Sequence, residues 1–327
     1  MVIREISYVE ALREALREEM LREPTLFVMG EDVTVAGVWG VTKGLAEEFG
    51  TERIRDTPIS EAAFCGAGIG AAMTGMRPII EIRFADFLFV AMDQIVNQAA
   101  KLRFMTGCQV KLPIVFRSAL GAGLSAGAHH SQSPEAMFMH VPGLQVVVPS
   151  TPYDAKGLFK TAVRGNNPVM FFEHKSLYSM KGPVPEEEYV IPFGEADIKK
   201  EGSDVTLVAT SMMLHRAIEA AKELEKEGIS VEVIDPRTLV PFDKQAVLKS
   251  VKKTSRLVVV EEDCKTGGVG AEIAAIVADE AFGYIDAPIK RVATPDIPIP
   301  FSRELESKVI PDVKSITKTV KEVMGLK

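Results

Sequence analysis

Apolar residues along this chain follow two alternating patterns, which predict helices and buried strands in turn. The first helix is predicted at Tyr8–Arg22, where apolar residues recur every three or four positions on one stripe: Val9, Leu12, Leu16 and Met20. Ser7 and Glu10 match a capping box, in which each side chain satisfies an unpaired amide of the first turn. The start of this helix is therefore encoded locally.

Continuous apolar runs in the first half of the chain predict strands buried on both faces. These strands are Thr25–Met29, Arg77–Phe84, Pro113–Arg117, Leu144–Val148 and Pro168–Phe172. The helices predicted between them are Glu61–Thr74, Phe87–Met105 and Tyr153–Arg164. Gly75 and Gly165, just past two of these helices, are typical helix stops.

The alternation lapses from Ser176 to Gly202, in a Pro-rich and then acidic stretch that is typical of a domain boundary. We therefore expect a first domain over residues 1–185, a linker over 186–202 and a second domain over 203–327. In the second domain the predicted strands are Val205–Thr210, Ser230–Ile234, Leu257–Glu261 and Ile289–Val292. Its predicted helices are Met213–Glu227, Lys244–Lys253, Gly268–Phe282 and Pro311–Met324. Both halves thus have the pattern of α/β domains, doubly wound around largely parallel sheets.

Composition narrows the class of function. The 327 residues carry a net charge of −7, which argues against a nucleic-acid binder and favours basic protein partners. Three cysteines without close pairs cannot build a disulfide framework, and so indicate a reducing compartment such as the cytoplasm. The early charged residues exclude a signal peptide, and no apolar run approaches the roughly 18 residues of a membrane span.

Glu61 is the first candidate for catalysis. It lies just ahead of a helix of small apolar residues that includes Gly66, Gly68 and Gly70, where a ring or another backbone could approach closely. A carboxylate at such a place would be partly desolvated, which favours its protonated form. The alternative is an acidic residue that only complements the positive end of the helix dipole.

The loop from Leu120 to Ser133 is the second candidate region. It contains Gly-rich sequence and the adjacent His129 and His130, between a buried strand and a helix. Loops at the carboxyl ends of parallel strands bind ligands in this fold class, and histidine transfers protons near neutral pH. At most one of two adjacent histidines can face a site in extended chain. A mobile surface loop with solvated histidines is the alternative.

Three further patterns give weaker hypotheses. Gly66-Ala67-Gly68-Ile69-Gly70 fits a dinucleotide-binding loop poorly, because its glycines lie inside the helix. Ser125, in Gly123-Leu124-Ser125-Ala126-Gly127, matches the string of a serine-hydrolase nucleophile elbow but lacks the adjoining strand and helix. The five histidines show no zinc-enzyme spacing.

Ordered motifs along almost the whole chain resemble a known family, the beta subunit of the thiamine-diphosphate-dependent first component of 2-oxo acid dehydrogenase complexes. That group includes the pyruvate, branched-chain 2-oxo acid and acetoin dehydrogenases. The matching motifs are Met29-Gly30-Glu31-Asp32-Val33, Thr57-Pro58-Ile59-Ser60-Glu61, Phe84-Ala85-Asp86-Phe87, Asp93-Gln94-Ile95-Val96-Asn97-Gln98-Ala99-Ala100-Lys101, His130-Ser131-Gln132, Pro149-Ser150-Thr151-Pro152 and Asn166-Asn167-Pro168-Val169.

The resemblance implies a transketolase-like fold with a pyrimidine-binding domain followed by a C-terminal domain. It also implies an α2β2 heterotetramer with a separate alpha subunit, which serves a lipoyl acyltransferase component. Glu61 matches the carboxylate that shares a proton with the aminopyrimidine ring of the cofactor, and Phe87 the aromatic residue beside that ring. His130 rather than His129 matches the family's histidine for acyl transfer to lipoamide.

Two family features concern metal ions. The Gly-Asp-Gly motif that begins the magnesium-diphosphate site is missing, and in two-chain relatives it belongs to the alpha subunit. Relatives often hold a structural potassium ion through backbone carbonyls, and Ile114, Ala162 and Asn167 are the matching positions. Gly165 stands where many relatives have aspartate, a departure at that site.

The substrate stays open between a 2-oxo acid and acetoin. The run from Pro183 to Glu195 is similar to acetoin dehydrogenase beta subunits, whereas His130–Ala136 is closer to the branched-chain enzyme. Two other functions remain as alternatives: a serine hydrolase that uses Ser125, and a non-catalytic scaffold that only holds an alpha subunit.

Overall fold

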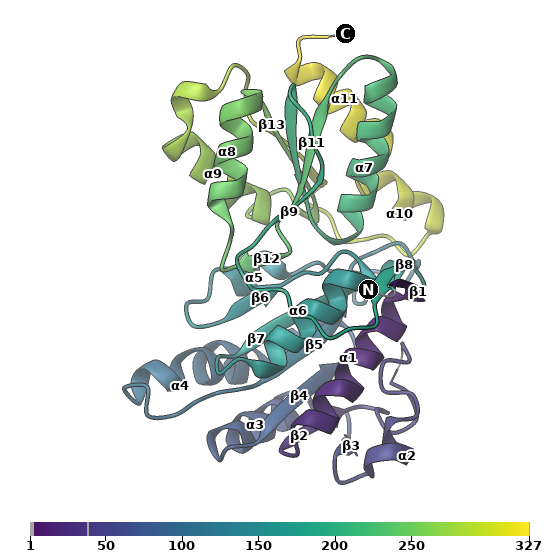
Figure 1. Ribbon diagram of the computed structural model, residues 1–327, viewed down its shortest axis with the longest axis vertical. Helices are drawn as coiled ribbons and strands as arrows, with labels where there is room; N and C mark the ends of the chain where they lie inside the picture. Colours follow the sequence, from purple (N-terminus) through teal and green to yellow (C-terminus); the bar gives the residue numbers. More distant parts are fainter. Residues whose placement is uncertain (1–2, 38, 327) are drawn as a thin grey trace. The chain divides into compact units, whose positions relative to one another are not determined.

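The computed structural model describes residues 3–37 and 39–326, which fold as two compact units (Figure 1). Unit 1 comprises the residues up to Leu120 together with Met137–Phe193. Unit 2 comprises Gly121–Ala136 together with the residues from Gly194 onward. The chain thus passes between the units inside the stretch expected as a linker, and the loop with both adjacent histidines belongs to unit 2.

Unit 1 is built around a parallel sheet with strand order β6-β7-β5-β4-β2-β3. Its strands are β2 (Leu26–Gly30), β3 (Ile54–Asp56), β4 (Arg77–Ile82), β5 (Val115–Leu120), β6 (Gln145–Val147) and β7 (Val169–His174). A separate antiparallel pair joins β1 (Ile3–Ser7) to β8 (Lys181–Pro185). Pro183 and Pro185 are tolerated in β8 because a two-stranded ribbon leaves one edge of each strand unpaired.

Helices of unit 1 cover both faces of its sheet, as right-handed crossovers in opposite directions require. The helices are α1 (Tyr8–Arg22), α2 (Leu45–Phe49), α3 (Glu61–Met73), α4 (Ala100–Met105) and α6 (Pro152–Arg164). α1 and α6 pack against each other, whereas α3 packs on β4. The predicted capping box of α1 is confirmed, with the Ser7 hydroxyl and the Glu10 carboxylate each accepting the other's backbone N–H.

One predicted helix is wrong in form. The stretch Phe87–Met105 is not a single α-helix but a 3₁₀ helix η1 (Ala85–Ala91), a π-helical turn η2 (Asp93–Ala99) and then α4. Apolar spacing could not distinguish them, because tighter and wider turns average to nearly the α-helical period. Such irregular turns are common near functional sites.

Unit 2 has a second sheet with order β14-β13-β10-β11-β9, parallel except for the edge strand β9. The strands are β9 (Asp197–Lys200), β10 (Val205–Ala209), β11 (Val231–Asp235), β13 (Leu257–Cys264) and β14 (Lys290–Thr294). The helices are α7 (Ser211–Lys226), α8 (Lys244–Thr254), α9 (Val269–Glu280), α10 (Arg303–Val309) and α11 (Val313–Val323). The short elements α5 (Glu135–Met139), β12 (Thr238–Val240), η3 (Lys175–Leu177) and η4 (Phe282–Tyr284) complete the chain.

The core of unit 2 lies between β10, β11 and β13 and the pair of helices α7 and α11. Ala122, from the inserted loop, is part of this core and is 1% exposed. The predicted α/β class with largely parallel sheets is confirmed for both units. α10 was not predicted, because its seven residues offer no apolar stripe.

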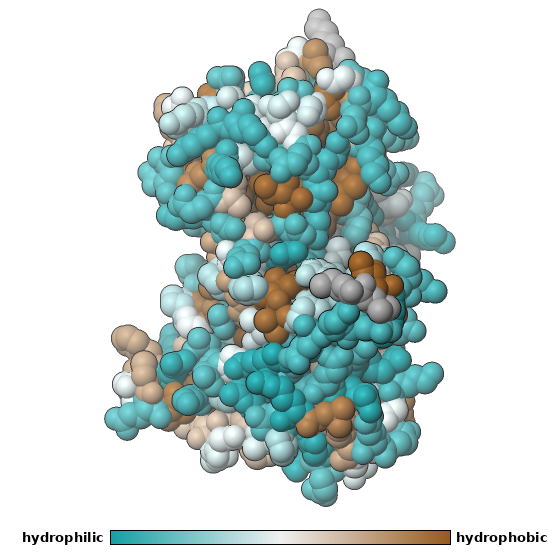
Figure 2. Space-filling model, in the orientation of Figure 1, coloured by the Kyte–Doolittle hydropathy of each residue, from teal (hydrophilic) through white to brown (hydrophobic). Residues whose placement is uncertain are grey.

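The outer surface is largely hydrophilic on the face shown in Figure 2, where apolar residues form small, separate patches. None of the helices within residues 3–37 and 39–326 combines the length and apolar composition needed to cross a bilayer.

Candidate active site

Three neighbouring strands of unit 1 bring together motifs that are far apart in the sequence. β4, β2 and β3 are adjacent and parallel, so their carboxyl ends share one edge of the sheet. The segments that follow β2, β3 and β4 begin with Glu31, Thr57 and Arg83, respectively. This edge is where ligands bind in open α/β sheets. The motifs around Glu31, Glu61 and Phe87 therefore belong to one candidate site.

Glu61 is the first residue of α3 and is only 6% exposed. A second buried carboxyl belongs to Glu31, which is 8% exposed. Burial raises the pKa of Glu31, and the negative charge of Glu61 raises it further. Arg83 partly offsets this rise in the pKa of Glu31, because its guanidinium lies 4.0 Å from the Glu31 carboxylate. The edge thus holds two acidic groups in mutual electrostatic contact, of which Glu31 binds a proton more readily than an exposed glutamate.

The sequence by itself assigns no role to Glu31, although this residue lies in the family motif Met29–Val33. The available signal was its position directly after the buried strand β2, at the carboxyl edge of a parallel sheet. Only the pairing of β2 with its neighbours brings the motifs to one edge.

The glycines of α3 have different reasons to be there. A Cβ at Gly68 would lie 2.5 Å from the Ile80 side chain, so Gly68 is needed for close packing of α3 on β4. A Cβ at Gly66 would meet only ordinary contact, and one at Gly70 would meet nothing within 4 Å. Packing within the chain therefore explains Gly68 alone, and the other two leave the helix backbone open to approach.

Phe87 lies in the 3₁₀ helix that follows β4 and is half-buried. Its ring contacts Phe84 edge to face, with 6.2 Å between the ring centroids. The Phe84 ring is in turn 5.3 Å from the ammonium of Lys175. These contacts fix an aromatic surface at the same edge of unit 1 as Glu31.

The loop with His129 and His130 forms a closed unit of its own within unit 2. The Gly121 N–H donates to the Gln132 carbonyl at 3.1 Å and closes the two ends, as in a compact Ω-loop. The His130 N–H donates to the Gly127 carbonyl at 3.2 Å. His129 is exposed, whereas His130 is half-buried. The structure thus places Glu61 and Phe87 in unit 1 and His130 in unit 2.

A buried acid, Glu135, and a half-buried one, Asp263, lie beyond the histidine loop in unit 2. Burial raises the pKa of Glu135 well above its usual range, and the charge of Asp263 adds to this. Burial likewise raises the pKa of Asp263 to about 7. The carboxylate of Asp263 accepts a hydrogen bond from its neighbour Cys264 N–H at 2.7 Å. These two groups favour holding a proton near neutral pH.

Ser125 does not have the surroundings of a nucleophile. Its hydroxyl lies 3.3 Å from the carboxylate of Glu306, on α10. A carboxylate in direct contact replaces the histidine that would take the proton in a serine hydrolase. The surrounding loop also lacks the strand-turn-helix geometry of a nucleophile elbow.

Oxygen atoms at the three candidate potassium positions already accept hydrogen bonds within unit 1. The Ile114 carbonyl accepts the Val169 N–H at 3.0 Å, and the Ala162 carbonyl accepts the Gly165 N–H at 3.3 Å. The side-chain oxygen of Asn167 accepts from the guanidinium of Arg103. A carbonyl oxygen has two lone pairs, so these contacts leave room for one further partner each.

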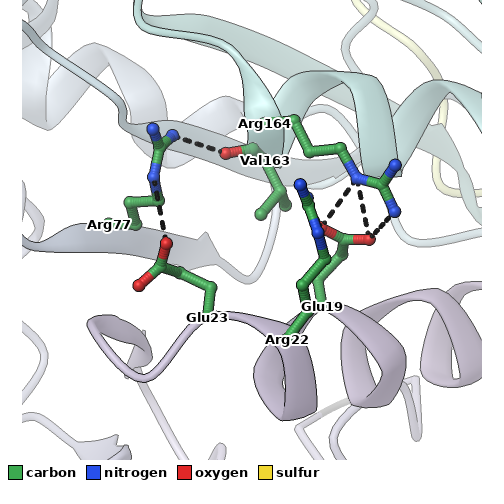
Figure 3. Close-up of a pocket in the computed structure, with 6 residues that line it drawn as sticks. All are labelled: Glu19, Arg22, Glu23, Arg77, Val163 and Arg164. Atoms are coloured by element: carbon green, nitrogen blue, oxygen red, sulfur yellow. Dashed lines mark hydrogen bonds and ion pairs between the residues drawn. The ribbon is translucent and has the colours of Figure 1, made fainter.

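A hollow of about 150 Å³ in unit 1 is lined by Val163 and by charged residues in or next to α1, β4 and α6 (Figure 3). Arg77 donates to the carbonyls of Val163 and Gly165 at 2.8 and 2.7 Å. Arg164 and Glu19 form an ion pair at 2.6 Å. The charged side chains of this hollow pair with one another and the backbone, so it serves packing of α1 on α6. Within residues 3–37 and 39–326, no group of three His, Cys, Asp or Glu side chains could hold a metal ion.

Two family models match consecutive parts of the chain. The pyrimidine binding domain of transketolase matches residues 4–181, and the C-terminal domain of transketolase matches residues 194–316. Among solved structures, a chain described as a split gene transketolase, inactive beta4 tetramer, superposes with a TM-score of 0.80 at 27% identity. The match covers 98% of this chain and 99% of that one.

Curated relatives are considerably closer in sequence. The 2-oxoisovalerate dehydrogenase subunit beta of Bacillus subtilis is 47% identical, over 97% of this chain and 98% of the relative. The acetoin:2,6-dichlorophenolindophenol oxidoreductase subunit beta of the same organism is 46% identical, over 98% of each chain. The pyruvate dehydrogenase E1 component subunit beta of Rickettsia felis is 48% identical, again over 98% of each.

Proposed function

This chain belongs to the transketolase-like family of E1 beta subunits, and we propose that with an alpha subunit it forms an enzyme that uses thiamine diphosphate to pass an acyl group to lipoamide. The substrate is a 2-oxo acid or acetoin, the two classes named for the relatives. One observation carries the proposal: the buried Glu61, at the head of α3, shares an edge of the sheet with Glu31. The serine-hydrolase and scaffold alternatives have no support.

Glu61 is suited to hydrogen-bond a basic ring nitrogen, because its carboxyl is buried at the head of α3. A second buried carboxyl lies at the same edge of the sheet, that of Glu31, whose pKa is raised by burial and by the charge of Glu61. Phe87 and Phe84 offer an aromatic surface in the segment that follows β4, at the same edge of the sheet. When bound, thiamine diphosphate supplies the electron sink that the reaction needs.

His130 is our candidate for proton transfer during acyl transfer to lipoamide. Its half-burial in a closed loop gives the ring a defined place, whereas His129 is exposed. Histidine is effective in this role because its ordinary pKa lies near neutral pH.

We assign the magnesium ion and the diphosphate to the alpha subunit. The chain has no Gly-Asp-Gly motif, and magnesium prefers oxygen ligands shared with phosphate. A structural potassium ion at Ile114, Ala162 and Asn167 stays a further proposal. A higher unfolding temperature of unit 1 in potassium than in sodium chloride at equal ionic strength would support it.

The proposed partners are an alpha subunit, in an α2β2 assembly, and a lipoyl acyltransferase component. Exposed apolar residues lie within or just after the motifs of the candidate site: Ile59 is 80%, Val35 75% and Val90 57% exposed. Exposed apolar side chains of this kind favour a protein partner. The split transketolase chain described as an inactive tetramer fits a chain that needs a different subunit for activity. The free cysteines, of which Cys108 and Cys264 are exposed, favour the cytoplasm.

Co-expression with an E1 alpha subunit tests the proposal. The pair should turn over one of pyruvate, branched-chain 2-oxo acids or acetoin, and Glu61→Ala should abolish that turnover. Glu52→Ala is the matched control, because the Glu52 side chain is 94% exposed. Full activity of the Glu61→Ala pair would leave only a scaffold role for this chain.

A further inference from the structure

Two carboxylates from other elements of unit 2 accept hydrogen bonds from the backbone of the loop that carries His129 and His130, here called the histidine loop. Glu262, on β13, accepts a hydrogen bond from the Ala122 N–H at 2.5 Å. Glu306, on α10, accepts from the Gly123 N–H at 2.8 Å and from the Ser125 N–H at 2.9 Å. The Ser125 hydroxyl adds the third contact with Glu306 described above.

The backbone of this loop is shaped to receive an anion. Gly121, Gly123, Ser125 and Gly127 all have positive φ, at 91°, 100°, 54° and 78°. Left-handed residues in alternation turn backbone N–H groups toward one side, which makes a concavity that binds negative charge. Ser125 adopts this conformation although it is not glycine, and its side chain and N–H both contact Glu306. The carboxylate of Glu306 fills this concavity.

Glu306 and the loop depend on each other. Glu306 is 2% exposed, and in the described part of the chain the hydrogen-bond donors to its carboxylate all come from this loop. A buried carboxylate without donors is strongly unfavourable, so opening of the loop would leave Glu306 unsatisfied.

Other residues in and near α10 show how this segment contacts the loop. Glu306 is the buried residue of this helix, whereas Leu305 is 52% exposed. Just ahead of the helix, the Phe301 ring covers the loop so closely that a Cβ at Gly127 would lie 3.2 Å from it. α10 therefore directs its one buried side chain to the loop, while Val309 at its end packs against the core of unit 2.

We propose that Glu306 is a positioning residue that holds His130 in place for acyl transfer to lipoamide. The inference rests on the proposed function, because it takes the role of His130 from there. The link is short: the anion-binding turn ends at Gly127, and the Gly127 carbonyl accepts the His130 N–H at 3.2 Å. The turn held by Glu306 thereby sets the backbone from which the imidazole projects.

The test uses the enzyme assembled with its alpha subunit and its acyltransferase component. Its substrate is whichever of pyruvate, branched-chain 2-oxo acids or acetoin the enzyme turns over. In Glu306→Gln the amide oxygen can still accept one loop N–H, but the amide nitrogen faces the other. We expect acyl transfer to lipoamide to fall roughly 10- to 100-fold, the scale of a small misplacement of a catalytic group. Reduction of 2,6-dichlorophenolindophenol, an artificial acceptor that bypasses lipoamide, should change by less than about twofold.

Three comparisons separate positioning from general damage. Glu304→Gln, on the exposed side of α10 where Glu304 pairs with Lys308, makes the same charge change and should leave both rates unaltered. Glu306→Gln combined with His130→Ala should be no slower than His130→Ala alone, because residues that act through one another are not additive. Amide hydrogen exchange should rise in residues 121–132 of Glu306→Gln while α7 stays protected.

The outcomes distinguish this inference from the proposed function. Normal acyl transfer in Glu306→Gln, beside a defective His130→Ala, would overturn the inference and leave the function intact. Normal acyl transfer in His130→Ala would overturn the assigned role of His130. Unchanged amide exchange in residues 121–132 would show that Glu306 does not hold the loop, whatever the rates.

Discussion

Replacement of Arg117 by methionine should destabilise unit 1 strongly. Arg117 lies on the central strand β5 and is 2% exposed. Its guanidinium donates to the Glu173 carboxylate from Nε at 2.8 Å and from Nη2 at 2.5 Å, and to Glu81 from Nη1. Glu81 and Glu173 are 5% and 0% exposed, and Arg117 forms an ion pair with each of them.

The magnitude follows from this arrangement of one cation between two carboxyls. Burial raises the pKa of Glu81, so this carboxyl can take up a proton when the arginine is lost. At least one buried carboxylate then remains uncompensated, which typically costs about 3–5 kcal/mol. For a unit of this size each kcal/mol lowers the melting temperature by about 2–4 °C, so we expect a decrease of about 6–20 °C.

The single tryptophan of the chain provides the measurement. Trp39 stacks on Tyr178 with 5.1 Å between ring centroids, and the Tyr178 hydroxyl donates to Glu173 at 2.7 Å. Its fluorescence therefore reports the unfolding of unit 1. The control is Arg17→Met, which removes an exposed ion pair with Glu48 and should move the transition little.

The pH dependence gives a second check with a defined sign. A carboxyl with a raised pKa in the folded state contributes stability at low pH and loses it as the pH rises through that pKa. The deficit of Arg117→Met should therefore shrink when the pH falls from about 7 to about 5, as protonation neutralises the freed carboxyl of Glu81. Equal shifts for Arg117→Met and Arg17→Met, or a deficit that does not depend on pH, would refute the reasoning.

Three other predictions concern the proposed cofactor chemistry and the stability of unit 2. Glu61→Gln should slow hydrogen-deuterium exchange at the thiazolium carbon of bound cofactor by about 10²–10⁴-fold, as measured by NMR after acid quench, and an unchanged rate would remove Glu61 from the mechanism. Calorimetry of the chain without an alpha subunit should show weak binding of thiamine diphosphate and magnesium, since half a site still bears the cost of immobilising the ligand; tight stoichiometric binding would contradict the two-subunit proposal. Asp263, whose pKa burial raises to about 7, should destabilise unit 2 as the pH rises from 6 to 8, and Asp263→Asn should flatten that dependence in denaturant titrations.

Sequence by itself determined the features that depend on neighbouring residues. The caps of α1 and α6 are contacts between residues three apart, as with the Thr151 hydroxyl that accepts the Asp154 N–H at 3.1 Å. Such contacts need only neighbouring residues and so can be predicted from the local sequence, as the apolar period likewise predicted the α/β class. The family motifs supplied Glu61, Phe87 and His130 as candidates for the same reason: each motif is a short continuous string.

Only the tertiary structure determines which of these motifs lie close together. Glu31 became a site residue only because β2 pairs with β4 and β3, so that separate motifs share one edge of a sheet. Glu306 is 181 residues from Ser125, and nothing in its seven-residue helix marks it as a partner of the histidine loop. A carboxylate can be buried there only because the loop's N–H groups point at it, and that geometry exists only after both segments have joined unit 2.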